Sequence, residues 1–292
     1  MRIVIALGGN ALIKKGQKGT GEEQMKTAEE AVSSFREIIE ENEIVITHGN
    51  GPQVGNLLIQ QNSTDEVPAM PLDVLDSMTQ GEIGYFLQRA LMRKTNRKSV
   101  TLVTRVVVDE DDPAFDTPTK PIGPFYKEKI KKNMVEDAGR GYRLVVPSPK
   151  PMKVVERKAI IPLLRERLIV IVGGGGGIPI KANGKGIEAV IDKDWCASLI
   201  GREIDAELLL IVTAVPGVYK NFGKENQEML NKITIREAKE MMDKGEFPEG
   251  SMKPKIEAAI YFLRHGGMKA IICGLENIKE AVEGKSGTAI TL

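Results

Sequence analysis

The segment Leu168-Ile169-Val170-Ile171-Val172 is followed directly by five glycines, Gly173 to Gly177. Its apolar residues are mostly β-branched and do not alternate with polar ones, which is typical of a parallel strand buried on both faces. Glycines can adopt positive φ and let backbone N–H groups approach an anion without a Cβ in the way. About one helix length later comes Ile191-Asp192-Lys193-Asp194, where a lysine can neutralise a transferring phosphoryl group. The sequence therefore predicts a phosphotransferase of the α/β class.

The bulk composition describes a globular chain without a strong electrostatic bias. Its 292 residues are 41% hydrophobic, which suffices for one large domain or two lobes. A formal charge of +1 and an aromatic content of 4% argue against nucleic acid as a partner. No apolar stretch approaches the roughly 18 residues of a membrane span. The N-terminus begins with a strand-like run and not with a signal-peptide pattern. We therefore expect a cytoplasmic protein with no nucleic-acid or membrane partner.

Cysteine and histidine are scarce in this sequence, with two of each. Cys196 and Cys273 lie far apart, and neither has the thiol or histidine spacing of a zinc site. We expect both thiols to be reduced and buried, as is usual in a cytoplasmic protein. No cluster of carboxylates calls for a metal either, so no metal ligands are predicted.

Apolar runs alternate with helical patterns along most of the chain. The runs occupy residues 3–7, 44–47, 100–108, 168–172, 208–212 and 271–273. The helix candidates occupy residues 24–42, 54–62, 73–95, 153–166, 193–202, 234–244 and 254–265. This order predicts a three-layer αβα sandwich, in which a mainly parallel sheet is covered by helices on both faces. Ligands are expected at the carboxyl ends of its strands.

Three of the apolar runs end in glycine-rich turns. These turns are Gly8-Gly9-Asn10, Gly49-Asn50-Gly51-Pro52 and Gly173–Gly177. One such pair of residues is weak evidence, because Gly-Gly and Asn-Gly mostly form ordinary turns. Carboxyl ends of parallel strands meet at one edge of a sheet, however, so the three turns are expected to converge on one crevice.

The alternation breaks between Asp109 and Pro151. This segment opens with acidic and proline-rich residues, continues with a basic, helix-like piece at 127–135, and then has a strand candidate from Arg140 to Val146. A segment of this length without a βα rhythm is either a disordered loop or a functional lid or subdomain. Its ordered-looking pieces favour a small protruding subdomain.

Seven motifs follow one another along nearly the whole chain. They are Ala6–Leu12, Thr47–Asn56, Pro118–Pro124, Arg143–Pro151, Gly173–Pro179, Glu188–Asp194 and Gly250–Ala259. Together they resemble the motifs of carbamate kinases, within the wider amino acid kinase superfamily. Seven matches in the right order make chance a poor explanation.

The resemblance implies an organisation and a reaction. An N-terminal lobe, residues 1–176, would bind the acyl substrate, and a C-terminal lobe, residues 177–292, would bind the nucleotide. The protruding subdomain would be residues 109–151. ADP and carbamoyl phosphate would give ATP and carbamate, which decays to ammonia and carbon dioxide, and the reaction would be reversible. The resemblance also implies Mg²⁺ held mainly by nucleotide phosphates, and a homodimer.

Three lysines and one aspartate are the catalytic residues implied by the resemblance. Lys193 would stabilise the transferring phosphoryl group, and Asp194 would hold the lysines through ion pairs without acting as a base. On local sequence alone, Asp192 and Asp194 equally fit a helix cap and a first-turn residue beside a solvated Lys193. Lys255, just after Pro254, would reach the β- and γ-phosphates, although by itself it fits a surface lysine at a helix start.

Lys120 would reach the site from the protruding subdomain. Many amino acid kinases carry a lysine two residues before the first glycine pair, but Ala6 stands at that position here. The resemblance implies that Lys120 supplies the missing charge. Carbamate is already an anion and needs no general base, so lysines and backbone N–H groups are the chemistry to expect.

Backbone and amide donors of the glycine turns are expected to bind carbamate and the phosphoryl group. The residues are Gly8, Gly9, Asn10, Gly49, Asn50, Gly51, Gly174, Gly175 and Gly176. His48 could be imagined as a phosphohistidine nucleophile, but no covalent step is needed, so a buried and hydrogen-bonded histidine is favoured. His265, beside Gly266-Gly267, fits a contact at a helix end.

The segment from Thr213 to Tyr219 resembles the adenine side of the family's nucleotide site. The resemblance implies nucleotide contacts from Thr213, Val215, Val218, Tyr219, Met252 and Lys255. Ala214 and Pro216 depart from the family, because related kinases often have aspartates at these places. Other departures are Glu82 and a short connection in the protruding subdomain.

Two other functions stay open on the sequence. The same fold could phosphorylate another small carboxylate, a phosphate monoester or a phosphonate, for which Glu82 and the short subdomain leave room. A non-catalytic nucleotide-binding regulator would be marked by loss of the motif lysines, yet Lys120, Lys193 and Lys255 are all present.

Overall fold

The computed structural model describes all residues except 15, 137–138, 140 and 249. The strands of its central sheet are β1 (Arg2–Leu7), β2 (Glu43–His48), β3 (Ser99–Thr101), β9 (Ile169–Ile171), β11 (Leu208–Thr213), β14 (Lys232–Thr234), β15 (Lys269–Gly274) and β16 (Thr288–Thr291). The smaller sheets contain β4 (Arg105–Val108), β5 (Lys120–Tyr126), β6 (Met134–Glu136), β7 (Tyr142–Val146), β8 (Pro151–Val154), β10 (Ile178–Ile180), β12 (Val218–Lys220) and β13 (Glu228–Leu230). The α-helices are α1 (Gly21–Glu41), α2 (Gly51–Gln61), α3 (Leu72–Lys94), α4 (Arg157–Arg165), α5 (Lys193–Glu203), α6 (Ile235–Asp243), α7 (Met252–Arg264) and α8 (Ile278–Val282). The short 3₁₀ turns are η1 (Gly9–Ala11), η2 (Pro113–Phe115), η3 (Gly174–Gly176) and η4 (Leu275–Asn277).

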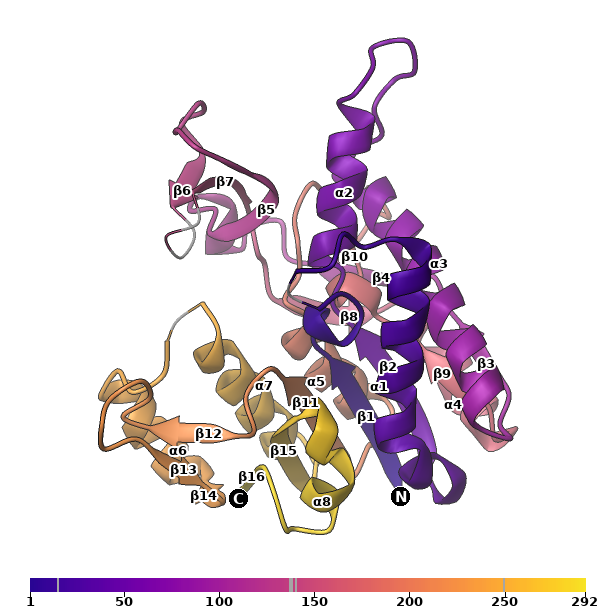
Figure 1. Cartoon of the computed structure of the whole chain (residues 1–292), viewed down its shortest axis with the longest axis vertical. Helices are drawn as coiled ribbons and strands as arrows, with labels where there is room; N and C mark the ends of the chain where they lie inside the picture. Colours follow the sequence, from indigo (N-terminus) through magenta and orange to yellow (C-terminus); the bar gives the residue numbers. More distant parts are fainter. Residues whose placement is uncertain (15, 137–138, 140, 249) are drawn as a thin grey trace.

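The central sheet has the strand order β14-β16-β15-β11-β1-β2-β9-β3 (Figure 1). All neighbouring pairs are parallel except β15 and β16, which are antiparallel. The prediction of a mainly parallel sheet is therefore confirmed. Its strands come from both expected lobes, and β1 and β11 join them by direct pairing from Ile3–Leu208 to Ala6–Ile211.

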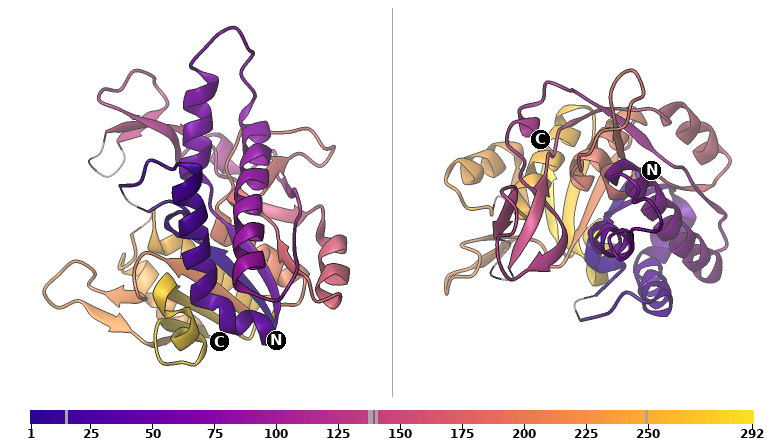
Figure 2. Two further views of the ribbon diagram at one scale, coloured as in Figure 1. Left: turned by 45° about the vertical axis from the view of Figure 1, so that its right-hand side comes forward. Right: turned by 90° about the horizontal axis from the view of Figure 1, so that it is seen from above.

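Helices cover both faces of this sheet, as expected for a three-layer sandwich. Along β1, Val4 and Ala6 belong to one apolar core, whereas Ile3, Ile5 and Leu7 belong to the other. The first core is completed by α4, α5, α6 and α7, and the second by α1, α3 and α8. Helices α1 and α3 pack against each other over the second face (Figure 2). Because both faces of the strands are buried, the strand sequences are continuously apolar.

The apolar run at 100–108 does not form one strand, and that expectation is wrong. It is divided into β3, at the edge of the central sheet, and β4, in the small sheet β10-β4-β8. The Gln80 side chain takes up hydrogen bonds at the interruption between β3 and β4. Its Oε1 accepts from Thr104 N at 2.7 Å, and its Nε2 donates to Gly174 O at 2.9 Å. Long-range side-chain bonds thus override the local β propensity.

The segment 109–151 contains an ordered three-stranded antiparallel sheet, β5-β7-β6, which projects from the main body (Figure 1). The strand candidate at 140–146 is confirmed as Tyr142–Val146, while Arg140 lies outside the described residues. The helix-like piece at 127–135 is wrong, because the chain turns there and enters β6. Its lysine-rich sequence lacks an apolar stripe to bury, and Ile130 is exposed.

Two glycines of α3 give a matched test of this packing. A Cβ on Gly84 would lie 2.4 Å from Thr101 Cγ2 in β3, whereas a Cβ on Gly81 would meet nothing within 4 Å. We expect Gly84→Ala to lower the free energy of unfolding by about 1–3 kcal/mol, because a β-branched neighbour cannot easily yield. Gly81→Ala should raise it by about 0.5–1 kcal/mol. Urea unfolding of both variants checks this, and equal effects would contradict the close approach of α3 to β3.

Candidate active site

Two of the glycine turns and the start of α5 meet at the carboxyl edge of the central sheet. A Cβ built on Gly49 would lie 3.4 Å from Gly9 N and 3.5 Å from Lys193 Cδ. A Cβ on Gly8 would lie 3.0 Å from Val212 O, at the end of β11. The turns after β1 and β2 therefore converge as the sequence predicts, with glycine leaving room for the chains to come together.

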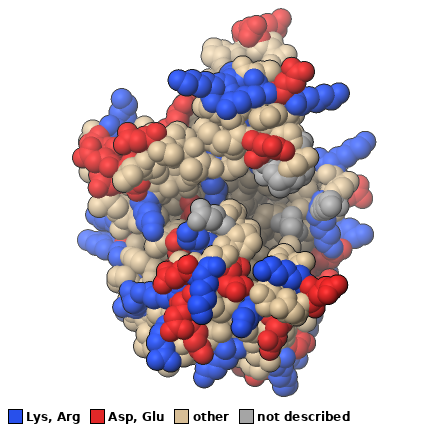
Figure 3. Space-filling model, turned by 90° about the vertical axis from the view of Figure 1, so that its left-hand side faces the viewer, with Lys and Arg blue, Asp and Glu red and all other residues tan. Residues whose placement is uncertain are grey.

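A cavity of about 570 Å³ opens at this point. Its lining residues are Gly8, Gly9, Ala11, Pro52, Lys193, Val212, Thr213, Ala214, Pro216, Lys255, Gly274, Leu275, Glu276 and Asn277. The space-filling view shows the hollowed face (Figure 3). Sequence reasoning missed η4, whose three residues close one side, because no glycine or lysine motif marks that turn.

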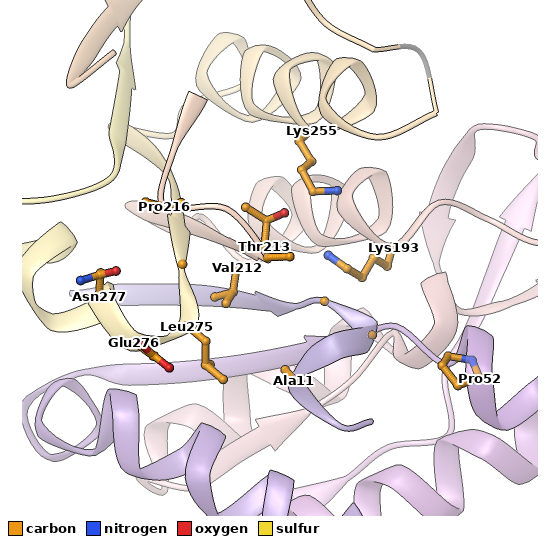
Figure 4. A pocket seen from close by; sticks show the side chains of 14 residues that line it. Ala11, Pro52, Lys193, Val212, Thr213, Pro216, Lys255, Leu275, Glu276 and Asn277 are labelled. Carbon is orange, nitrogen blue, oxygen red and sulfur yellow. The ribbon is translucent and has the colours of Figure 1, made fainter. Parts of the chain in front are cut away.

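Two lysines point into this cavity from different helices (Figure 4). Lys193 is the first residue of α5, and Lys255 lies in the first turn of α7. Both ammonium groups pair with one carboxylate: Lys193 Nζ donates to Asp194 Oδ1, and Lys255 Nζ lies 3.1 Å from Asp194 Oδ2. The Asp194 side chain is only 2% exposed. Lys193, Lys255 and Asp194 together carry one net positive charge, which favours an anion beside the two lysines.

The environment shifts the pKa of both lysines. Burial lowers the pKa of Lys193, and the Lys255 ammonium lowers it further, while Asp194 opposes both effects. Burial also acts to lower the pKa of Lys255, but the Asp194 carboxylate outweighs it and the net shift is upward. The shared carboxylate is thus what keeps two ammonium groups close together in a buried place.

Lys120 reaches towards the site from β5, as the sequence predicts, and pairs with Asp192. The distance from Lys120 Nζ to Asp192 Oδ2 is 2.8 Å. The other oxygen, Oδ1, accepts from Asp194 N at 2.9 Å and caps α5. Burial would raise the pKa of Asp192, but Lys120 and Lys193 lower it to about 2. Lys120 is not among the residues that line the cavity.

The five-glycine segment has a packing role in this structure. Gly174, Gly175 and Gly176 are buried and are not among the residues that line either cavity of the site. A Cβ on Gly174 would lie 2.5 Å from the His48 ring, and one on Gly175 would lie 2.4 Å from Asn50 Nδ2. Gly175 and Gly176 also have positive φ, +69° and +98°. Only glycine permits this close approach of the turn after β9 to its neighbours.

The side chain of Asn50 is held beneath the site. Its Nδ2 donates to Asp76 Oδ1 and to Thr79 Oγ1, both at 2.8 Å. The Thr79 hydroxyl itself donates to Asp76 O, so it can only accept from Asn50, which fixes the orientation of the amide. Both amide hydrogens of Asn50 are therefore used within the protein. The side chain of Asn10, in η1, lies outside the described part.

Because the amide of Asn50 is used within the protein, the backbone N–H groups at the start of α2 are the available hydrogen-bond donors here. Gly51 is the first residue of this helix, and a Cβ there would meet nothing within 4 Å. Pro52 follows and lines the cavity. Asn50 occupies the N-cap position but makes no side-chain cap bond. An 11-residue helix that opens without a side-chain cap at the cavity edge is suited to an anion.

The two histidines and two cysteines lie as expected. His48 is fully buried, its Nδ1 is 3.1 Å from Gly49 O, and burial lowers its pKa to about 4, so it is neutral near pH 7. His265 ends α7, with its Nδ1 2.8 Å from Tyr261 O. Cys196 and Cys273 are free and buried. Among the described residues, no group of three or more His, Cys, Asp or Glu side chains is placed to hold a metal ion.

A second cavity of about 200 Å³ adjoins the first and shares Thr213, Ala214 and Lys255 with it. The predicted nucleotide residues Val215, Tyr219 and Met252 line it, together with Phe222, Glu246, Phe247, Pro248 and Ser251. Val218 does not, because its side chain is fully buried in the core. Side chains alternate along β12, so Val218 faces inward and Tyr219 faces the cavity. The largely apolar lining suits a flat aromatic base.

Comparison with known proteins gives a consistent result. The model of the amino acid kinase family matches residues 1–274, so the chain belongs to the amino acid kinase family. Within it, the chain falls among the carbamate kinases: those of Thermococcus kodakarensis and Pyrococcus horikoshii are each 46% identical to it over 310 aligned positions. These alignments cover 99% of this chain and 98% and 99% of the two relatives. Because 310 exceeds 292 by 18, at least 18 positions of each alignment have no counterpart here.

A solved structure agrees with the sequence relatives. The carbamate kinase from Giardia lamblia bound to AMP-PNP superposes with a TM-score of 0.91 at 39% identity, over 99% of this chain and 98% of that one. The amino acid kinase fold predicted from the sequence is thereby confirmed. Of the described helices, none is both long and apolar enough to span a membrane.

The buried carboxyl of Asp76 makes the stability of this site pH-dependent. Its Oδ1 accepts from Asn50, its Oδ2 has no hydrogen-bond partner among the described residues, and burial raises its pKa from 3.8 to about 7. Because the pKa is raised in the folded state, the fold binds this proton more tightly than the unfolded chain does. The carboxyl therefore has no effect on stability below about pH 4, destabilises the fold progressively between about pH 4 and pH 7, and adds no further pH dependence above that range.

Asp76→Asn should remove that pH dependence. Asparagine keeps an oxygen for Asn50 but has no proton to lose, so its stability relative to the wild type should rise by a few kcal/mol between about pH 4 and pH 8. Urea unfolding at the two pH values measures the difference. Asp65→Asn, on the exposed loop after α2, is the control. Parallel pH profiles for wild type and Asp76→Asn would show that Asp76 is not the responsible group.

Proposed function

We infer that this chain is a carbamate kinase, which transfers a phosphoryl group reversibly between ATP and carbamate. The observation that carries this is the pair Lys193 and Lys255, held by one buried carboxylate in a cavity between two glycine turns. Such a site can neutralise a phosphoryl group in transfer, and no histidine, serine or cysteine is among the described residues that line the cavity. That is the chemistry which an acceptor that is already an anion requires.

We propose that the substrates occupy the two adjoining cavities. The adenine lies in the apolar cavity beside Tyr219 and Met252, and the phosphates extend past Lys255, which borders both cavities. Carbamate lies at the opposite end, against Gly8, Gly9 and the open start of α2. The transferring group then passes beside Lys193, between the two. Residues 1–176 thus serve the acceptor and residues 177–292 serve the nucleotide.

Charge and position supply the catalysis. Lys193 and Lys255 neutralise the oxygens of the transferring group, and Asp194 fixes both ammonium groups before the substrates arrive. Lys120 adds a third positive charge from the subdomain. The buried turn Gly174–Gly176 supports His48 and Asn50 from below. His48 stays neutral and shapes the turn.

Mg²⁺ fits this site as a partner of the nucleotide. Glu276 is the one carboxylate among the residues lining the main cavity, and the described residues contain no cluster of metal-binding side chains. We propose that the ion is held mainly by the nucleotide phosphates, where it supplies charge neutralisation. The lysines of this chain then serve the oxygens that the ion leaves free.

No observation favours a different acceptor or a regulatory role. Glu82, which departs from the family, accepts from Gln24 Nε2 at 3.1 Å and does not line the cavity. It therefore adds no specificity for another substrate. The three motif lysines are all placed at or beside the site, which is the opposite of what a degenerate kinase would show.

ATP formation from ADP and carbamoyl phosphate, with Mg²⁺ present, tests the proposal. We expect rapid turnover by the wild type and a loss of about 100- to 1000-fold in kcat for Lys193→Ala, because a donor to the transferring group is removed. Lys158→Ala, on the exposed side of α4, is the control and should keep full activity. Acetyl phosphate serves as the competing donor.

Two outcomes would be decisive against parts of this proposal. A folded, ADP-binding wild type that makes no ATP from carbamoyl phosphate would refute the reaction. Near-normal turnover by Lys193→Ala would refute the role of that lysine and leave the reaction standing.

We further propose that the protein is cytoplasmic and forms a homodimer. Buried reduced thiols suit the first statement. For the second, Met78, Tyr85 and Met92 are exposed and spaced seven residues apart, which places an apolar stripe along the outer side of α3. Helix α3 lies next to β3, the edge strand of the central sheet. A second copy would cover both features.

Light scattering after gel filtration tests the dimer. Tyr85→Glu should shift the protein from dimer to monomer, because it introduces a charge in the middle of the apolar stripe. Ile130→Glu, at an exposed residue of the subdomain, should leave the dimer intact. A wild type that is monomeric at micromolar concentration would contradict the proposal.

A further inference from the structure

The subdomain that carries Lys120 contacts the main body along α2 and at the segment before α5. Its sheet β5-β7-β6 is separate from the central sheet. A small apolar cluster lies beneath it, in which Ile122 and Val146 pack with Val190 and with residues of α2 and α3. Val190 N also donates to Pro147 O at 3.0 Å. The segment just before Lys193 therefore lies against the base of the subdomain.

Asp192 ends this segment and uses its two oxygens for two different elements. Oδ1 caps α5 by accepting from Asp194 N, and Oδ2 pairs with Lys120 at 2.8 Å. The Asp192 side chain is 20% exposed and that of Lys120 is 35% exposed, so the pair is shielded without being dry. One carboxylate thus ties the first residue of β5 to the first turn of α5.

The other charges of the site leave Asp192 as the counter-charge for Lys120. Asp194 is already occupied by Lys193 and Lys255, so it cannot compensate a third ammonium. Lys120 and Lys193 both lie close enough to Asp192 to lower its pKa, so without Asp192 the Lys120 ammonium would lose its counter-charge in a place that already holds other cations. A flexible lysine would then move into solvent, where its charge is screened.

We propose that Asp192 is a positioning residue for the transfer reaction: it holds Lys120, and with it the base of the protruding subdomain, beside Lys193 before the substrates bind. This inference rests on the carbamate kinase activity proposed above. If the lysine side chain is already ordered, its conformational entropy need not be lost when the substrates bind or react. The activation free energy is then lower and the rate is higher. Asp192 itself touches no reacting atom.

Asp192→Asn is the informative variant, because asparagine keeps the oxygen that caps α5 and removes the charge that holds Lys120. We expect kcat to fall about 10- to 100-fold, with a small change in the KM for ADP, since the second cavity is untouched. Hydrogen exchange of the β5 amides should quicken, while that of α5 stays unchanged. Asp192→Ala should quicken both, because it loses the cap as well.

Two controls isolate the contact. Asp112→Asn changes another aspartate whose oxygens accept from backbone N–H groups, of Ala114 and Lys150, at the foot of the same subdomain. It should leave kcat and β5 exchange nearly unchanged. In a Lys120→Met background, Asp192→Asn should cost less than threefold more, because its partner is already gone.

The outcomes separate this proposal from the function on which it rests. If the wild type lacks carbamate kinase activity, the function fails, while exchange of β5 still tests the contact. If the wild type is active and Asp192→Asn retains full kcat, the positioning role is overturned. Fully additive losses for Asp192→Asn and Lys120→Met would also overturn it, since they would show that the two side chains act independently.

Discussion

The structure of the active site depends on the buried carboxylate of Asp194, which is shared by two lysines. Two ammonium groups on different helices would repel each other and resist burial, and a single negative charge between them offsets both effects. The three side chains together keep one net positive charge, which favours an anion beside them. Asp194 thus allows two cationic side chains to be held close together while the cluster stays positively charged. Truncating it would leave two buried cations without a partner, which is why the α5 and α7 starts can meet only around this residue.

Local sequence was enough to predict most of the framework. The apolar runs at 3–7, 44–47, 208–212 and 271–273 became strands because burial on both faces requires continuously apolar sequence. The run at 100–108 and the lysine-rich piece at 127–135 were predicted wrongly for different reasons. The break in the first is set by the Gln80 side chain, which is distant in the chain, and no local propensity reports such a contact. The second lacks an apolar stripe that a helix could bury, and the chain turns there before it enters β6.

The motifs identified the charged residues of the site, but they did not identify all of the ion pairs that these residues form. Lys193, Lys255 and Asp194 lie together as expected, but the pairing of Lys120 with Asp192 could not be derived from spacing, because 72 residues separate them. For the five-glycine segment, the sequence indicated a close contact but not its partner. The backbone of this segment packs against the side chains of His48 and Asn50 and does not line the cavity. A glycine in the sequence indicates that another group packs closely against the backbone, but the identity of that group is known only from the three-dimensional structure.

The continuous central sheet has a mechanical consequence. Strands β1 and β11 join residues 1–176 to residues 177–292 by an unbroken parallel ladder, with apolar cores packed on both faces. Bending between the two halves would break these hydrogen bonds and open both cores together. The platform is therefore stiff, and the parts free to admit substrate and release product are peripheral: the subdomain sheet and the β12–β13 hairpin beside the second cavity. We expect any motion that accompanies substrate entry or product release to be confined to these two elements.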